Sequence, residues 1–258
     1  MADHDPRVTD SAGQPWAGRH FASHPSPDDD GSAPPELVAA IARFRAGEAD
    51  QAVVVEAFRT SRLLVPLLAE LGEAGVTPEG RRVDKRQELS IVTVQGPDDR
   101  TVLPVFSSVA AMTAWNSAAR PVPATGPRVA LAAASEGTDL VVLDPTSPTE
   151  FALRRPAVWA VAQERAWVPC YVDPEVATEF ARSVIDEPAV TALVLAAGDP
   201  GARLHGPELR IELSLVPGLE ASQLDGLLSR LSERWSRSEL IASRVDSLEV
   251  ALEASSRV

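Results

Sequence analysis

The chain is short of cysteine, lysine and aromatic residues, and it has no long apolar run. Its single cysteine, Cys170, excludes an internal disulfide and is typical of a protein of the reducing cytoplasm. The longest apolar run, residues 190–197, is far shorter than the roughly 20 residues that cross a bilayer. Residues 1–30 are polar and acidic, without the apolar segment of a signal peptide. These shortages predict a soluble, cytoplasmic protein with no membrane contact.

Basic residues are also scarce, because 37 acidic residues stand against 24 basic ones and the formal net charge is −13. A field of this sign repels the phosphate backbone, so nucleic acid is not an expected partner. The sequence has no G-x-G-x-x-G and no Walker pattern, the usual phosphate cradles, and we expect no cofactor.

Three of the four histidines, His4, His20 and His24, fall in the polar first segment. His20 and His24 would share a face only in a helix, and no CxxC or HExxH accompanies them. We therefore interpret them as solvated residues and predict no metal site.

Residues 1–33 combine charged residues with Gly, Ser and Pro and show no apolar period, which predicts a disordered acidic tail. Trp16 within it has no evident packing partner and could serve as a docking anchor. Two ordered domains are expected beyond the tail, over residues 34–169 and 170–258.

The first domain is predicted to contain a mixed sheet with flanking helices. Pro35 and Asp50 are placed to begin two helices. Residues 63–68 indicate a buried strand that Pro66 should place at a sheet edge or bulge. Two β runs around a turn-rich link predict a hairpin over residues 89–106.

The rest of this domain is expected to be mostly helical. One helix should begin at Ser108, bury Met112 and Trp115, and be ended by Pro121 and Pro123. Further segments follow, with helices predicted over 127–135 and 156–167, the latter carrying Trp159 into the core, and a strand over 140–143.

The second, smaller domain is predicted to follow the order α-β-β-α-β, with its helices on one face of a small sheet. The expected elements are a helix over 174–185, strands over 190–197 and 209–216, a helix over 219–235 and a last strand over 248–252. The predicted fold class of the whole chain is α+β.

An apolar strand over residues 101–106 stops at Ser107 and Ser108 and leads directly into a helix. A serine at such a junction caps free helix N–H groups, and the same helix end can hold an anion. A serine hydrolase would also need a base and an orienting acid. His205 is the only histidine beyond the tail and G-x-S-x-G is absent, so we predict a cap and no catalytic residue.

Two groups of arginines are candidate binding residues. Arg154 and Arg155 are near the Asp144 turn in the sequence. Two interpretations are open: an arginine here forms an ion pair with Asp144, or it binds an anion. A stripe on the predicted helix over 219–235 and just beyond it either pairs with local acids such as Glu233 or docks an acidic partner or a second copy. That stripe consists of Arg230, Arg234 and Arg237.

Short motifs spread along the chain together resemble the SseB family, named for enhanced serine sensitivity. Motifs similar to the N-terminal domain of that family lie at residues 64–66, 103–108, 115 and 143–145. Motifs similar to the C-terminal domain of its high-GC actinobacterial members lie at residues 215–219 and 244–248. The family often has threonine where Ser107 stands, and both residues supply a hydroxyl. The resemblance implies an α+β fold and a bacterial cytoplasmic protein whose molecular activity is not established, and it carries over no catalytic residue.

The absence of a catalytic cluster favours a non-enzymatic adaptor or regulatory protein that acts through protein contacts or self-association. The alternative is a small-molecule binding protein or enzyme connected with amino-acid (serine) metabolism, with its site around Ser107, Ser108 and Arg154. A deep polar pocket converging on those three residues would favour the alternative, and a large exposed apolar patch would favour the adaptor.

Overall fold

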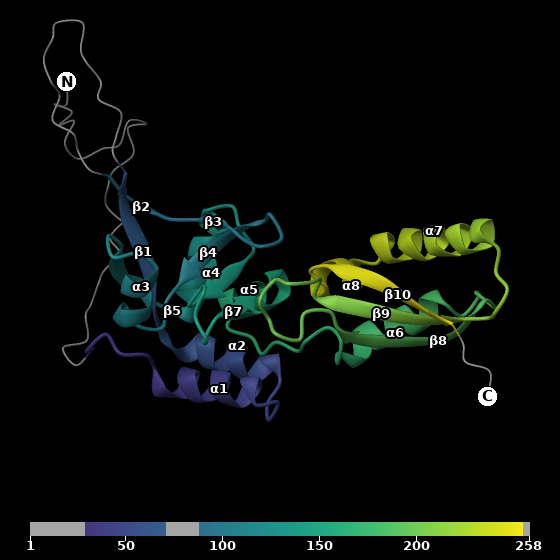
Figure 1. The fold of residues 1–258 in the computed structure, drawn as a ribbon, viewed down its shortest axis with the longest axis horizontal. Helices are drawn as coiled ribbons and strands as arrows, with labels where there is room; N and C mark the ends of the chain where they lie inside the picture. The colour runs from purple at the N-terminus through teal and green to yellow at the C-terminus, as the bar shows by residue number, and fades with distance from the viewer. Residues whose placement is uncertain (1–28, 71–87, 255–258) are drawn as a thin grey trace, which may run out of the picture. The chain divides into compact units, whose positions relative to one another are not determined.

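The computed structural model describes residues 29–70 and 88–254. The described residues from Gly31 onward belong to one compact unit, and every feature below lies within it (Figure 1). The predictions for the acidic tail up to residue 28, for Trp16 and for the tail histidines lie outside the described residues. The division into domains at residues 169 and 170 stays a prediction.

The first two helices, α1 (Pro35–Arg45) and α2 (Gln51–Thr60), form where the proline and the cap predicted them. The Asp50 carboxylate accepts hydrogen bonds from the N–H groups of Ala52 and Val53, which begins α2. Gly47, which separates the two helices, has a φ of 73°, a value that glycine adopts without strain.

The first sheet has the strand order β2-β1-β5 and is antiparallel throughout. Its strands are β1 (Arg62–Glu70), β2 (Glu88–Ile91) and β5 (Arg120–Thr125). The prediction that Pro66 places its strand at a sheet edge is wrong, because β1 is central. Pro66 is accommodated between the Leu64–Phe106 bridge and the start of β2 pairing at Leu67, where no N–H is needed.

The sequence does not predict the strand β5, because its two prolines are typical of the end of a helix. Pro121 lies opposite Pro66 and Pro123 lies opposite Leu64, whose backbone groups bond Phe106 on the other side. Both prolines therefore occupy positions whose missing N–H would point away from β1. Proline suits such positions on an edge strand.

The second sheet has the order β3-β4-β6-β7, with β4 and β6 parallel and the outer pairs antiparallel. Its strands are β3 (Val94–Gln95), β4 (Thr101–Val105), β6 (Val141–Leu143) and β7 (Phe151–Leu153). The predicted hairpin is confirmed only for the short β3–β4 pair, since β2 joins the other sheet. The three-residue strand β7 was not predicted.

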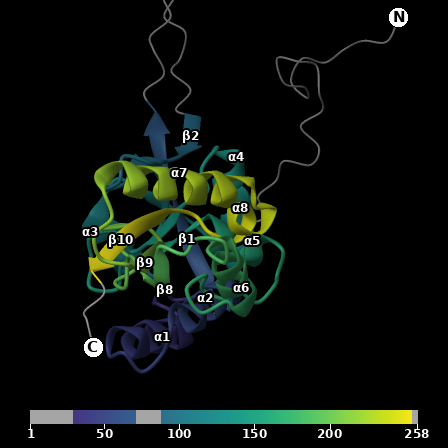
Figure 2. The same ribbon diagram turned by 90° about the vertical axis from the view of Figure 1, so that its right-hand side faces the viewer.

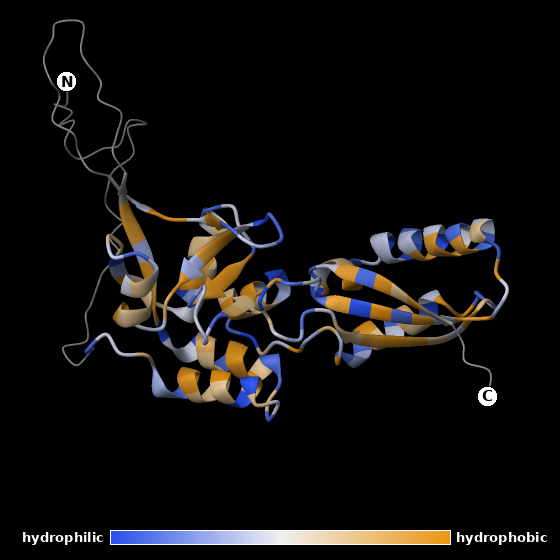
Figure 3. Cartoon of the chain, viewed as in Figure 1, coloured by the Kyte–Doolittle hydropathy of each residue, from blue (hydrophilic) through white to orange (hydrophobic). Residues whose placement is uncertain are grey.

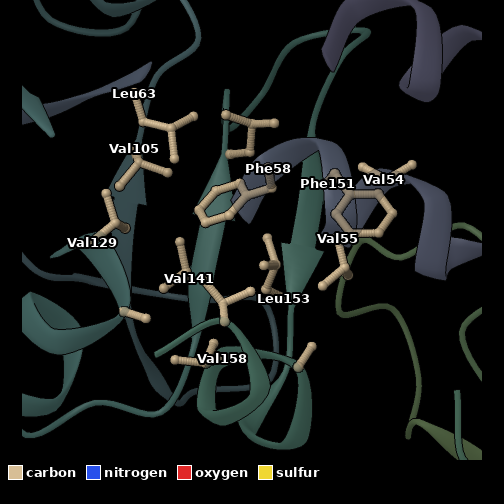
Figure 4. Close-up of a cluster of buried hydrophobic side chains, with 14 of the residues drawn as sticks. Val54, Val55, Phe58, Leu63, Val105, Val129, Val141, Phe151, Leu153 and Val158 are labelled. Atoms are coloured by element: carbon tan, nitrogen blue, oxygen red, sulfur yellow. The ribbon is translucent and has the colours of Figure 1, made fainter. Parts of the chain in front are cut away.

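Three helices accompany these sheets, namely α3 (Val109–Trp115), α4 (Gly126–Ser135) and α5 (Arg155–Ala162). Helix α3 buries Met112, and Trp115 packs on Phe106 with ring centroids 5.2 Å apart. Helices α1, α2, α4 and α5 line the main apolar core, in which Phe58 meets side chains of β4, β6 and β7 (Figure 4). The prediction that Trp159 belongs to the core is wrong, because 43% of it is exposed.

The last part of the chain forms the third sheet, order β10-β9-β8, with its helices packed on one face as predicted. The elements are α6 (Pro174–Ser183), β8 (Val190–Ala197), β9 (Leu209–Leu215), α7 (Ala221–Arg237), α8 (Glu239–Arg244) and β10 (Leu248–Ala254). The short helix α8 was not predicted. Strand β10 is parallel to β9, and α7 runs beside β10 in Figures 1 and 2.

Alternation along β9 explains which face of this sheet is covered. Its odd-numbered residues are buried against Phe180 of α6 and Trp235 of α7, whereas Arg210 and its even-numbered neighbours are less buried (Figure 3). A strand with one covered face shows this period of two. Among the described residues, no helix has the length and apolar character needed to span a bilayer.

Candidate functional site

The serine pair after β4 has two separate roles. Ser108 caps α3, because its Oγ accepts a hydrogen bond from the Ala111 N–H at 3.1 Å. Ser107 is buried, and its N–H and hydroxyl donate to the two oxygens of Asp144 at 2.8 and 2.7 Å. The predicted helix cap is therefore confirmed for Ser108, while Ser107 is a hydrogen-bond donor to a buried carboxylate.

Asp144 directly follows β6, and its partners among the described residues are uncharged donors. Besides Ser107, the Thr149 hydroxyl donates to its Oδ2 at 2.9 Å. Asp144 and Thr146 have φ angles of 45° and 64°, so the loop that follows β6 is tightly wound around this carboxylate. We call Asp144, Ser107 and Thr149 the Asp144 cluster.

The predicted ion pair between Asp144 and Arg154 or Arg155 is wrong, because both arginines have other partners. Arg154 is buried between β7 and α5, and its guanidinium contacts Asp199 at 2.9 Å and Asp246 at 3.3 Å. It also donates to the Gly206 carbonyl at 2.6 Å. We call Arg154, Asp199 and Asp246 the Arg154 cluster, which joins three segments far apart in the sequence.

Asp199 organises the loop between β8 and β9. Its Oδ2 accepts hydrogen bonds from the N–H groups of Arg203 and Leu204, at 3.0 and 2.7 Å, in addition to Arg154. Leu204 has a φ of 59° and packs into a small apolar cluster with residues of β4, β6 and β7. Ala202 in the same loop accepts from the Ala152 N–H at 2.8 Å and thereby covers the edge of β7.

Asp246 connects the Arg154 cluster to the surface. Its carboxylate also binds Arg100 at 2.9 Å, and Arg100 in turn pairs with Asp98 at 2.7 Å. Ser247 donates to Asp246 and accepts from the Glu208 N–H. A chain of alternating charges therefore leads from the β3–β4 turn into the buried interior.

Glu208 is a third buried carboxylate beside this chain. Burial, together with the nearby charge of Asp246, raises the pKa of Glu208 to about 7, although its Oε2 accepts from the Asp246 N–H at 2.6 Å. The Cys170 thiol lies against Glu208. Burial is the main cause that raises the pKa of Cys170, and the negative charge of Glu208 adds to it. A buried thiol of this kind is a poor nucleophile, because only the thiolate reacts.

A pocket of about 460 Å³ opens beside the Arg154 cluster. Basic side chains of Arg100, Arg154 and His205 contribute to its wall, and neither Ser107 nor Ser108 does. The remaining lining residues are Pro97, Asp98, Leu204, Gly206, Pro207 and Ser247. The three residues proposed from the sequence for one small-molecule site are therefore not brought together around this pocket.

Among the described residues, the Ser107 hydroxyl and the histidine lie at different places. Ser107 donates its hydroxyl proton to a carboxylate in a buried cluster, and His205, the single histidine in the described ranges, lines the pocket near Arg154 instead. Within the same ranges no three His, Cys, Asp or Glu side chains gather in a way that could hold a metal ion.

Arg155 and Trp159 form a surface feature at α5. The Arg155 guanidinium lies over the Trp159 ring, 5.3 Å from its centroid, and donates to the carbonyls of Ala242 and Val245 at 2.8 and 2.6 Å. The indole N–H of Trp159 donates to Asp139 at 3.3 Å. An exposed aromatic ring is thereby held in one orientation.

The arginine stripe of α7 pairs with nearby acids. Arg230 and Arg234 both bind the buried carboxylate of Glu187, at 2.6 and 2.9 Å. They lower the pKa of Glu187, and the hydrogen bond from Arg230 is the largest cause. Arg237 pairs with Glu233 at 2.6 Å. Glu187, which lies just before β8, was not foreseen as the shared partner.

Sequence reasoning named Arg154 but missed Asp199, Asp246 and Glu208. A local signal exists for Asp199, which lies in a Gly-Asp-Pro-Gly turn between two strands. Nothing local indicates that Asp199 and Asp246 meet Arg154, because these contacts span 45 and 92 positions.

Comparison with known proteins places one part of the chain. Residues 37–160 match the family model described as the SseB protein N-terminal domain. That segment runs from α1 into α5 and contains the whole Asp144 cluster and Arg154, while Asp199 and Asp246 lie beyond it. No curated protein and no solved structure matches the chain.

Proposed function

We infer, from the similarity of residues 37–160 to the SseB N-terminal domain, that this chain is an SseB-like, non-enzymatic cytoplasmic adaptor that acts through protein contacts. The adaptor role rests on the surface of the molecule. Two observations support it: the indole of Trp159 is exposed, and the polar candidate residues already have partners within the chain.

The observation that carries the proposal is the exposed indole of Trp159. Tryptophan and arginine are enriched among the residues that contribute most to protein binding. Here the ring is held by Arg155 and Asp139, so little conformational freedom remains to be lost on binding. Val168 and Val172, in the segment after α5, are also at least half exposed. These features support a protein-binding surface that includes α5.

The engagement of the polar candidates argues in the same direction. Ser107 is committed to Asp144, Ser108 to the start of α3, and Arg154 to two carboxylates. A ligand that recruited any of them would have to displace an internal contact, and for the buried residues Ser107 and Arg154 this costs the most free energy. The three residues also do not meet in one pocket.

The test is affinity capture from the native cytoplasm with the wild-type chain and the Trp159→Ala variant. We expect at least one protein that the wild type captures stoichiometrically and the variant does not. Leu131→Ala is the matched control, because Leu131 is 58% exposed on the neighbouring helix α4. It should capture the same protein as the wild type.

Identical capture by all three chains would contradict the proposal, provided circular dichroism shows them equally folded. Trp159→Ala is expected to remain folded, because the ring lies outside the apolar core, although loss of its contacts with Arg155 and Asp139 should cost about 1 kcal/mol.

The alternative, a small-molecule binding protein or enzyme connected with amino-acid metabolism, is supported by the pocket with Arg100, Arg154 and His205 on its wall. Native mass spectrometry of the freshly purified chain distinguishes the two. A copurified metabolite that is lost in Arg100→Ala would favour the alternative, and its absence together with a Trp159-dependent protein partner would favour the adaptor.

We further propose that residues 170–258 are the SseB-like C-terminal domain of an actinobacterial member. The motifs at 215–219 and 244–248 support this, and they flank the α7–α8 region of the third sheet. Expression of residues 34–169 and 170–258 as separate chains tests the boundary: each should unfold cooperatively by itself, and residues 34–169 should be less stable than in the whole chain because Arg154 loses Asp199 and Asp246.

A further inference from the structure

Strand β10 is an open sheet edge with exposed apolar side chains. The third sheet has the order β10-β9-β8, so β10 pairs with β9 on one side and with no described strand on the other. Leu248 and Leu252 are 37% and 44% exposed, while Val250 between them is partly buried against the core. All three lie on the helix-covered side, in register with Leu209, Ile211 and Leu213 of β9.

Three other edges among the described strands carry features that hinder pairing with a further strand. Strand β5 carries two prolines whose nitrogens point outward, and β8 is irregular between Val190 and Ala192. The edge of β7 is covered by the loop that contains Ala202. Strand β10 spans seven residues with neither proline nor a basic residue, and its pairing with β9 is regular. It therefore remains open to another strand.

The backbone of β10 is oriented for further pairing. Leu209 donates its N–H to the Ser247 carbonyl at 3.0 Å, which fixes the side of the strand that faces β9. Because backbone groups alternate along a strand, residues 249 and 251 also bond β9, and the N–H and C=O groups of Leu248, Val250 and Leu252 point outward. The exposed leucines and the outward backbone groups thus belong to the same residues.

We propose that β10 pairs antiparallel with β10 of a second copy of this chain, about a two-fold axis at Val250. In this register Leu248 lies opposite Leu252 of the second copy, and Leu252 opposite Leu248, so both exposed leucines are covered at once. The outward N–H and C=O groups of all three residues meet acceptors and donors across the seam. The two sheets become one six-stranded sheet with both helix layers on the same face.

The charge of Glu249 favours this register over a neighbouring one that also keeps the two helix-covered faces on the same side. An axis at Val250 sets Glu249 opposite Ala251, whereas an axis at Glu249 would set this glutamate opposite Glu249 of the second copy, and like charges directly opposite each other are destabilising. The net charge of −13 on each copy opposes association at low ionic strength. We therefore expect the dimer to strengthen with added salt. The proposal is independent of the adaptor role and of the Trp159 surface.

The experiment is sedimentation equilibrium on the full chain and three variants. The wild type should show twice the mass of one chain, with a dissociation constant that falls as salt is raised. Leu252→Lys should sediment as a monomer, because it places a charge opposite Leu248. Val194→Lys is the matched control, an equally drastic change at a valine that is 53% exposed on β8, and it should remain dimeric.

The third variant tests the register itself. In the double variant Leu248→Glu, Leu252→Lys, the axis at Val250 sets each glutamate opposite a lysine of the second copy, so the dimer should return. A wild type that is monomeric at all salt concentrations overturns the proposal, and so does a Leu252→Lys variant that still dimerises. A folded double variant that stays monomeric overturns the register.

Discussion

The Asp144 cluster and the Arg154 cluster solve the same problem by different means. Each keeps a carboxylate buried, but Asp144 is satisfied by hydroxyl and N–H donors, whereas Asp199 and Asp246 share the guanidinium of Arg154. The first needs no countercharge and uses two nearby segments. In the second, the Arg154 guanidinium links residues of three segments, and Arg100 pairs with Asp246 as well. The difference predicts that one cluster loses its donors one at a time, while the other fails as a unit.

Removal of Arg154 should have the largest effect on stability. Arg154→Ala leaves Asp199 and Asp246 without their shared cation, and breaking a buried ion pair typically costs about 3 to 5 kcal/mol. Urea denaturation measures the free energy of unfolding directly. Arg210→Ala is the control, since its exposed pairs with Glu212 and Glu249 are worth about 1 kcal/mol or less. Equal losses in the two variants would contradict the buried role of Arg154.

Glu208 should make the stability of this region depend on pH. Its pKa in the folded chain, about 7, lies above the ordinary glutamate value of 4.5, so the folded state holds the proton more tightly than the unfolded state. The contribution is complete below pH 4.5 and is lost as the pH rises to about 7, a difference of about 3 kcal/mol.

The Glu208→Gln variant provides the comparison for that pH dependence. Its free energy of unfolding should fall less than that of the wild type between pH 4.5 and 7, as followed by urea denaturation at several pH values. Parallel curves for the two chains would show that Glu208 does not titrate in this interval.

A smaller loss is expected at the Asp144 cluster. Ser107→Ala removes the hydroxyl donor, but the Ser107 N–H and the Thr149 hydroxyl still bind the carboxylate. A hydrogen bond to a charged group contributes about 1.5 to 3 kcal/mol, so the free energy of unfolding should drop within this range. Ser107→Thr keeps the hydroxyl and should restore most of the loss. A loss as large as that of Arg154→Ala would remove the contrast between the clusters.

The cap next to it should matter least. Ser108→Ala deletes the acceptor for the Ala111 N–H, and such a change costs about 1 kcal/mol. Ser108→Asp keeps an acceptor at the start of α3 and should recover that stability. Urea denaturation is the measurement, and a denaturation midpoint unchanged by Ser108→Ala would show that water replaces the cap.

Local patterns determined most of the elements that the sequence predicted. Asp50 identified the start of α2, and β8 has the predicted bounds, Val190–Ala197. Strand β5 was missed because its prolines look like terminators unless the direction of their nitrogens is known. Trp159 was misplaced because helical spacing cannot tell which stripe of a short helix faces solvent.

The candidate site shows the same boundary between local and distant information. The Ser108 cap follows from a strand-to-helix junction that is visible in eight residues. The partners of Arg154 cannot be predicted from a local pattern, because their positions depend on how the β8–β9 loop and the start of β10 pack on β7. A charged residue beside a proline-started helix indicates a partner without identifying it.

Cys170 gives this molecule a built-in reporter of its own opening. The thiol is buried and is the chain's single cysteine, so an alkylating reagent can modify the protein there only when the surroundings of Glu208 come apart. Pulsed labelling followed by intact-mass measurement therefore counts the opened molecules without any engineered probe. The same inert thiol leaves the surface free for a single introduced cysteine, which would carry a fluorophore at one known position.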